Sequence, residues 1–236
     1  MKIGVIGGNG VAATNRLCEM IERKKTAAGA FRDAHHPEMI VWQATSVPSR
    51  SMFLEGRGPD WRPDYIHIAK QLKELGCDIG CMCCNTAHYA IDDIVEGSGL
   101  PFVNLLEEVA KRVNALNLPR VELWVSDGAR KLDIYGPVFK RIAPGCEIIY
   151  PNDERQKEVT KIICAVKTSA RFLSAGDPVH PHAMIRELLK SSTAPVVLGC
   201  TDIRAAYSVE EPLEDRIICD SLATLADALV QNDNVR

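Results

Sequence analysis

The strongest constraint on the fold is a regular alternation of short apolar runs with longer stretches of helical periodicity. Between the runs, apolar residues recur every three or four positions, as at Leu17, Met20 and Ile21, a spacing typical of an amphipathic helix. Strands separated by helices form parallel sheets with right-handed crossovers, so the sequence predicts an α/β fold. The apolar runs lie at 3–6, 39–44, 79–83, 121–125, 147–150, 196–198 and 217–219.

An apolar strand that ends in a cysteine occurs twice, about half the chain apart. The first copy, at 80–88, reads GCMCCNTAH and contains Cys84; the second, at 195–202, reads PVVLGCTD and contains Cys200. The carboxyl ends of parallel strands are where open α/β folds bind ligands. Two similar halves, each with a thiol at that edge, predict a site between two lobes.

Cys84 and Cys200 each precede a predicted helix start. Helix amino termini stabilise a thiolate and bind carboxylates, so the duplicated context favours a reactive pair. A free cysteine is more often a small buried apolar residue, and we interpret the other cysteines on predicted helices and strands in this way. His88, one turn after Cys84, either tunes that thiol or packs in the interior. The cysteines interpreted as packing residues are Cys18, Cys146, Cys164 and Cys219.

Two other motifs suggest alternative chemistry. A metal or iron–sulfur cluster at Cys77, Cys81, Cys83 and Cys84 is disfavoured, because the spacing differs from paired Cys-x-x-Cys sites and alternate strand residues point to opposite faces. The turn at 8–10 matches a loose dinucleotide fingerprint, but no acidic residue ends the second strand. A tight turn that approaches any carboxylate needs the same glycines.

Charge and composition restrict the class of partner. The 236 residues carry 28 Lys and Arg against 31 Asp and Glu, a net charge of −3, which gives no electrostatic basis for binding nucleic acid or an anionic membrane. No stretch approaches the ~20 apolar residues of a membrane span, and no secretory signal is expected. The nine cysteines are therefore expected to be reduced, in the cytoplasm. We expect a small-molecule partner.

The motifs around Cys84 and Cys200 resemble those of the aspartate/glutamate racemase family, and most closely its aspartate racemase branch. The resemblance covers almost the whole chain. Supporting motifs are Gly7-Gly8-x-Gly10, Val47-Pro48-Ser49-Arg50 in the long loop at 45–63, Asp127-Gly128, Lys167 and Asp220-Ser221.

The resemblance implies two pseudo-symmetric flavodoxin-like lobes, with 1–102 plus 211–236 in the first and 103–210 in the second. It also implies racemisation without a cofactor or metal, and a homodimer. Cys84 and Cys200 would be the catalytic acid/base pair. The implied substrate-binding residues are Ser49, Arg50, Ser51, Asn85, Thr86, Ala87, Ser126, Lys167 and Thr201.

The sequence thus predicts an amino-acid racemase that acts on an acidic amino acid, with aspartate as the first candidate. Alternatives are a glutamate, hydantoin or broad-specificity racemase, an arylmalonate-type decarboxylase, an NAD(P)-dependent oxidoreductase and a non-catalytic amino-acid sensor. The chain departs from the family at several expected pocket positions, where the family commonly has Met, Pro, Asp, Thr and Glu. The corresponding residues here are Asn9, Val11, Ser49, Ala129 and Asp202.

Overall fold

The computed structural model describes residues 1–233 and contains a first sheet of three parallel strands. Its strand order is β2-β1-β3, and every neighbouring pair is parallel. In the central strand, Ile3 and Val5 pack toward one side and Ile6 toward the other, as the period-two geometry of a strand requires. A single bridge from Gly80 to Phe102 adds a fourth, very short extended segment. The strands are β1 (Lys2–Gly7), β2 (Glu38–Gln43) and β3 (Ile79–Met82).

The second sheet has four parallel strands in the order β5-β4-β6-β7. Its strands coincide with the apolar runs of the second half of the chain. Two parallel sheets with intervening helices confirm the predicted α/β class. The strands are β4 (Arg120–Trp124), β5 (Glu147–Ile149), β6 (Val196–Leu198) and β7 (Ile217–Asp220).

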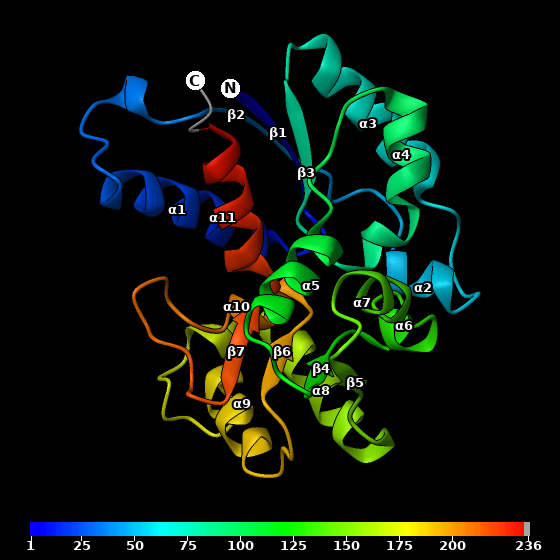
Figure 1. The fold of residues 1–236 in the computed structure, drawn as a ribbon, viewed down its shortest axis with the longest axis vertical. Coiled ribbons are helices and arrows are strands. Elements are labelled where there is room, and N and C mark those ends of the chain that lie inside the picture. The colour runs from blue at the N-terminus through cyan, green and yellow to red at the C-terminus, as the bar shows by residue number, and fades with distance from the viewer. Residues whose placement is uncertain (234–236) are drawn as a thin grey trace.

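Helices cover both faces of each sheet (Figure 1). In the first lobe, α1 and α11 lie on one face, and α3 and α4 lie on the other. The helices longer than five residues are α1 (Val11–Ala27), α3 (Arg62–Glu74), α4 (Ile91–Ser98), α5 (Leu105–Ala115), α7 (Gly136–Ile142), α8 (Asp153–Val166), α9 (Pro181–Leu189) and α11 (Ser221–Asp233). The short ones are α2 (Arg50–Leu54), α6 (Asp127–Lys131), α10 (Thr201–Arg204) and the 3₁₀ helices η1 (Asp33–His35), η2 (Thr86–Ala90) and η3 (Ser169–Phe172).

Local sequence signals explain where several helices begin. The side chain of Asn104 accepts a hydrogen bond from the Glu107 amide at the start of α5, and Asn152 does the same for Arg155 at the start of α8. Acidic residues follow in both first turns, where they complement the helix dipole. By contrast, α1 begins at Gly10 with no capping side chain and no acid in its first turn.

The segment after residue 210 contributes to both lobes. Its strand β7 pairs with β6 in the second sheet, whereas α11 packs against α1 and α5. Asp233 at the end of α11 lies 3.4 Å from the amino-terminal nitrogen and 2.8 Å from Lys25 Nζ. The sequence assigned this segment as a whole to the first lobe. In the structure, only the helix lies beside the first sheet, because the strand extends the second.

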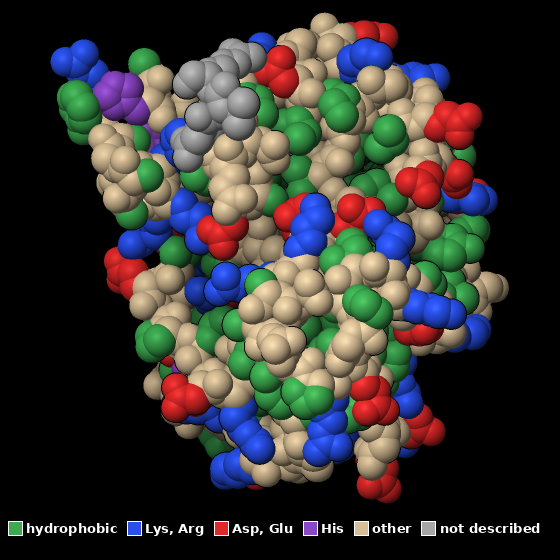
Figure 2. All heavy atoms as spheres, in the orientation of Figure 1, with side chains coloured by type: hydrophobic (Ala, Val, Ile, Leu, Met, Phe, Trp, Pro, Cys, Tyr) green, Lys and Arg blue, Asp and Glu red, His purple; other side chains and the backbone are tan. Residues whose placement is uncertain are grey.

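One hydrophobic cluster joins the two lobes. It includes Val5 of β1 and Leu123 of β4, together with apolar residues of α1, α5 and α11. Two smaller clusters, one around Trp61 and one around Trp124, lie in the first and second lobes respectively. No helix within residues 1–233 combines the length and apolarity that a membrane span requires. On the face shown in Figure 2, positive and negative side chains are interspersed.

Candidate active site

Cys84 and Cys200 line one small cavity of about 80 Å³ between the lobes. Each lies two residues beyond a strand, Cys84 after β3 and Cys200 after β6, so the cavity opens at the carboxyl ends of both sheets. The duplicated strand–cysteine motif therefore brings its two thiols to a single site. The lining residues are Asn9, Ser49, Arg50, Ser51, Cys83, Cys84, Asn85, Thr86, Ser126, Ile163, Lys167, Cys200, Thr201 and Asp202.

Every residue predicted from the sequence to bind substrate lines this cavity except Ala87. Ala87 is fully buried in the first-lobe cluster around Trp61, and its backbone N–H donates to the Cys84 carbonyl. It lies behind the cavity wall because η2 turns its methyl group toward α3 and α4. Ala87 therefore supports the Cys84 loop from the core.

The two thiols do not stand at long helices. Cys200 is the residue before the four-residue α10, and Cys84 precedes a 3₁₀ helix. The expected helix-dipole stabilisation of a thiolate is therefore weak, because a macrodipole needs several aligned turns. Burial raises the pKa of the Cys200 thiol well above its ordinary value, and the Asp202 carboxylate raises it further. Without a ligand, Cys200 is accordingly a neutral thiol at pH 7.

Hydroxyl groups connect the lobes across one side of the cavity. The Thr86 and Ser126 hydroxyls lie 2.9 Å apart, one from each lobe. Thr201 donates a 3.1 Å hydrogen bond to the carbonyl of Cys83. Ser126 also caps α6. These contacts place three hydroxyls beside the thiols.

Asn85 fixes the loop that carries Cys84. Its amide nitrogen donates to Ser221 Oγ over 2.9 Å, and its amide oxygen accepts from the Tyr135 hydroxyl. Only 3% of Asn85 is exposed. One amide hydrogen remains for a ligand, so most of the bonding capacity of this side chain is structural.

His88 is an interior residue that holds the same loop. Its Nδ1 lies 2.9 Å from the Cys84 carbonyl oxygen, and its Nε2 lies 3.4 Å from the Val103 carbonyl oxygen. Burial lowers the pKa of His88 to about 4, so the ring is neutral near pH 7. The sequence left two roles open for His88, tuning the Cys84 thiol or packing in the interior. This geometry agrees with packing, since both ring nitrogens face backbone carbonyls.

The opposite side of the cavity is charged. Lys167 Nζ lies 3.0 Å from Asp202 Oδ2 and donates to the Asn9 carbonyl over 3.3 Å. Burial acts to lower the pKa of Lys167, but the Asp202 carboxylate outweighs it and raises the pKa overall. Burial raises the pKa of Asp202, and Lys167 opposes that rise. The pair brings a cation to the cavity wall.

Asp202 explains why residue 10 is glycine. A Cβ on Gly10 would lie 1.8 Å from Asp202 Oδ1, so no other residue fits without displacing the carboxylate. The carboxylate thus stands at the amino terminus of α1, where α1 has no acid of its own. The same approach would be needed by a dinucleotide pyrophosphate, so this contact argues against the dinucleotide interpretation.

Three buried polar atoms of the cavity wall have no hydrogen-bond partner among the described residues. They are Asn9 Nδ2, Arg50 Nε and Asp202 Oδ1. The Arg50 guanidinium is otherwise engaged, because Nη1 donates to the carbonyls of Pro48 and Val47 over 2.9 and 3.4 Å. Buried polar atoms are rarely left unpaired, so two donors and one acceptor at one cavity indicate a ligand with the complementary groups.

Sequence reasoning did not assign roles to Asn9 and Asp202. Both stood out as departures from the family pattern, which was the available signal, but their contacts connect residues far apart in the chain. Ser49 and Ser51 lie as expected, although Ser49 also caps α2 and Ser51 packs against Gly128 of the other lobe. No group of three or more His, Cys, Asp or Glu side chains within residues 1–233 is arranged to hold a metal ion.

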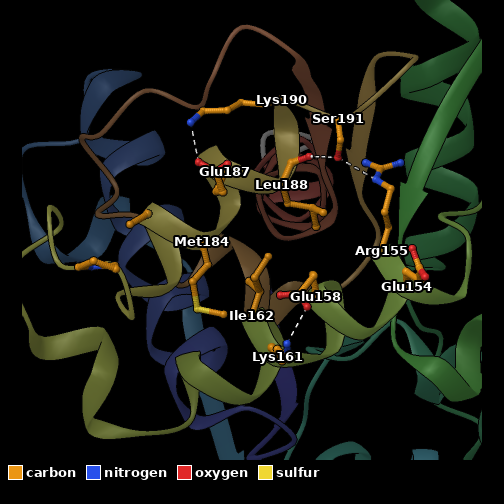
Figure 3. Close-up of a pocket in the computed structure, with 12 residues that line it drawn as sticks. Glu154, Arg155, Glu158, Lys161, Ile162, Met184, Glu187, Leu188, Lys190 and Ser191 are labelled. Atoms are coloured by element: carbon orange, nitrogen blue, oxygen red, sulfur yellow. Dashed lines mark hydrogen bonds and ion pairs between the residues drawn. The ribbon is translucent and has the colours of Figure 1, made fainter.

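A larger hollow of about 940 Å³ lies on the outer side of the second lobe, between α8 and α9 (Figure 3). Four of its charged side chains form two ion pairs, Lys161 with Glu158 at 2.6 Å and Lys190 with Glu187 at 2.5 Å, and Arg155 pairs with the buried Glu122 at 2.7 Å. It contains neither thiol and no unpaired buried donor. The candidate site is therefore the smaller cavity between the lobes.

Two lobes with parallel sheets, each supplying a cysteine to a shared cavity, define the class of two-lobed α/β racemases. The chain belongs to the Asp/Glu/hydantoin racemase family, whose model matches residues 3–229. This result confirms the family resemblance and makes the protein a member of an isomerase family.

Relatives and solved structures agree with this assignment. The broad-specificity amino-acid racemase RacX of Bacillus subtilis (strain 168) is 27% identical over 240 residues, which cover 97% of this chain and 96% of RacX. The aspartate racemase of Picrophilus torridus superposes with a TM-score of 0.79 at 22% identity, covering 100% of this chain and 95% of that one. A glutamate racemase of Campylobacter jejuni gives 0.61 at 14% identity, covering 99% and 86%. The two solved structures share the fold.

Proposed function

We propose that this protein racemises an acidic amino acid, with aspartate as the first candidate, without a cofactor. Cys84 and Cys200 are the proposed acid/base pair. The observation that carries the proposal is that the two lobes each supply one thiol to a single cavity whose unpaired atoms complement a zwitterion. Donors on Asn9 and Arg50 suit a carboxylate, and the acceptor on Asp202 suits an ammonium group.

Inversion of the α-carbon requires a proton to leave one face and another to arrive on the opposite face. One base alone tends to return the proton to the face it left, whereas two thiol groups, one ionised and one protonated, perform both steps. The raised pKa of Cys200 suits it to donate the arriving proton first. For the other enantiomer, the two cysteines exchange roles.

The developing α-carbanion needs stabilisation, since the α-proton is weakly acidic. The hydroxyls of Thr86, Ser126 and Thr201 lie beside the thiols and are proposed to hold the α-carboxylate. Arg50 and Lys167, on the charged side of the cavity, are proposed to hold the second carboxylate.

A broad-specificity racemase is the second candidate. Its support is the similarity to RacX over nearly the full length of both chains. The two candidates differ in how strongly the charged side of the cavity favours an acidic side chain over a neutral one. An aspartate racemase would process aspartate far faster than amino acids with neutral side chains.

The test is proton NMR of single enantiomers in heavy water, with enzyme freed of metals and cofactors. Loss of the α-proton signal together with inversion supports a racemase, and the series of amino acids reports specificity. Binding of aspartate without exchange would indicate a sensor instead. Oxidation of a substrate that depends on added NAD(P) would indicate the oxidoreductase.

The thiol assignment is tested by Cys84→Ala and Cys200→Ala. Each change should lower racemisation about a hundredfold or more, because each removes one of the two proton-transfer groups. Cys164→Ala is the matched control, since Cys164 is an exposed free cysteine on α8. Exchange of one enantiomer's α-proton can persist in a single-thiol variant. Full racemisation by either active-site variant would disprove the two-base mechanism.

We also propose that the protein is a homodimer, as the family resemblance implies, and that it is cytoplasmic, as the nine cysteines expected to be reduced suggest. Size-exclusion chromatography with light scattering should give twice the chain mass, and cell fractionation should recover the protein with cytoplasmic markers. A monomer at micromolar concentration would contradict the proposed homodimer.

A further inference from the structure

Asn9 carries an unpaired amide group in the wall of the cavity. It lies in the turn between β1 and α1, and only 7% of it is exposed. Its Oδ1 accepts a hydrogen bond from the Tyr65 hydroxyl, whereas its Nδ2 has no partner among the described residues.

Tyr65 determines which way that amide faces. Tyr65 is fully buried on α3, and its ring packs edge-on against Trp61 with centroids 4.8 Å apart. Because its hydroxyl donates to Oδ1, the amide nitrogen is turned away from Tyr65 with both hydrogens unpaired. Two buried N–H donors without an acceptor are unfavourable. Asn9, Lys167 and Asp202 line both the cavity that holds the thiols and an adjoining hollow of about 460 Å³ at the start of α1, so a ligand that reaches this corner of the site meets the Asn9 amide.

The surroundings of Asn9 identify the kind of acceptor. The Arg50 guanidinium carbon lies 5.9 Å from the centroid of the Tyr65 ring, and Lys167 Nζ lies 3.3 Å from the Asn9 carbonyl oxygen. Asn9 and its partner Tyr65 therefore lie close to both cations that line the cavity. Amide and guanidinium donors together suit an anionic oxygen, and the hydroxyls that suit the α-carboxylate lie near the thiols.

We propose that Asn9 is a specificity-determining residue that donates hydrogen bonds to the side-chain carboxylate of the substrate, with Tyr65 as its positioning residue. The proposal rests on the proposed function, because it assigns one group of the acidic substrate to one corner of that site.

The decisive variant is Asn9→Asp, which keeps the shape and the bond from Tyr65 but replaces the amide nitrogen by an anionic oxygen. The readout is the ratio of kcat/KM for aspartate to that for 2-aminobutyrate, in which a methyl group replaces the carboxylate. We expect the ratio to fall at least tenfold in Asn9→Asp and in Asn9→Leu, because only aspartate has a side-chain carboxylate that can lose the hydrogen bonds from Asn9. An unchanged ratio, or an equal fall for both substrates, overturns the proposal.

Tyr65→Phe separates positioning from structure. It removes only the hydroxyl, so it should raise KM for aspartate severalfold while kcat and the KM for 2-aminobutyrate stay near their original values. Equal effects on both substrates would mean that Tyr65 acts through the fold alone. That outcome would overturn its role as a positioning residue.

Binding measurements keep this inference separate from the proposed function. Calorimetric titration with succinate and with butyrate compares the same carboxylate-to-methyl change in ligands that cannot be racemised. The preference for succinate should fall at least tenfold in Asn9→Asp. If the original protein exchanges no α-proton of any amino acid, the racemase proposal fails. The succinate-to-butyrate preference still decides the role of Asn9, since a preference unchanged in Asn9→Asp overturns it.

Discussion

Arg50 performs two tasks with one side chain. Its Nη1 donates to the carbonyls of Pro48 and Val47, which orders the loop before α2. Its Nε is buried and unpaired at the cavity. A guanidinium can do both because it has five N–H donors in a fixed plane, whereas an ammonium group cannot span the same distances.

Replacing Arg50 should therefore affect acidic substrates selectively. Arg50→Leu is expected to weaken the use of aspartate relative to alanine by about 1.5–3 kcal/mol, the scale of a charge-assisted hydrogen bond. Arg50→Lys should recover only part of the loss. The measurement is the ratio of kcat/KM for the two amino acids. Arg57→Leu is the control, because Arg57 is exposed and pairs with Glu55.

A ratio that stays the same in Arg50→Leu would remove Arg50 from the substrate-binding site. Lys167, which already lies at the cavity, would then be the remaining cation for the second carboxylate.

At this scale, the sequence predicted the residues that recur in motifs and missed those defined only by contact. Cys84 and Cys200 stood out because their context is duplicated. Asp202 faces Gly10 from the other half of the chain, and the Asn9–Tyr65 bond joins two different elements. Whether a buried polar atom has a partner depends on such contacts, which the spacing of residues in the sequence does not predict.

At the scale of elements, the sequence predicts an element better when its apolar pattern extends over more residues. All seven strands were expected close to their observed positions because several apolar residues mark each of them. The short helix α2 was missed, because it lies inside the segment expected to be a loop at 45–63, whereas the helix start expected after Cys200 is present as the four-residue α10. A helix of one turn has no periodicity to detect, and contacts with the other lobe stabilise it instead.

The 3₁₀ helix η2 gives a prediction about pH. His88 is neutral in the folded protein because burial lowers its pKa from 6.5 to about 4. Between these values the unfolded chain binds a proton that the folded chain does not, so the stability present above pH 6.5 is lost as the pH falls toward 4. The full effect corresponds to roughly 3 kcal/mol.

Urea denaturation at pH 7, 6 and 5 checks this expectation. His88→Gln keeps a donor for the Cys84 carbonyl but cannot titrate, so its stability should decline less steeply than that of the original protein. His67→Gln, at an exposed position on α3, is the matched control and should leave the slope unchanged. Identical slopes for the original protein and His88→Gln would contradict the assignment.

At the scale of the whole molecule, the cavity lies between lobes that share one core. The cluster containing Val5, Leu123 and the apolar face of α11 continues from the first sheet to the second. The hydrogen bond between the Thr86 and Ser126 hydroxyls and the one from the Thr201 hydroxyl to the Cys83 carbonyl also cross the boundary. Two thiols on separate lobes can keep one geometry only if the lobes move and unfold together.

The lobes should accordingly unfold in one transition, which two tryptophans can report. Trp61 lies in the first-lobe cluster and Trp124 in the second-lobe cluster. The third tryptophan, Trp42, lies in β2, so proteins in which Trp42 and one of the other two are replaced give local fluorescence signals. In each, the urea midpoint from fluorescence should coincide with that from far-UV circular dichroism. Leu225→Ala, in fully buried α11 packing, should cost about 2–5 kcal/mol and move both reporters equally. Separate midpoints, or a shift seen by only one tryptophan, would mean that the shared core does not couple the lobes.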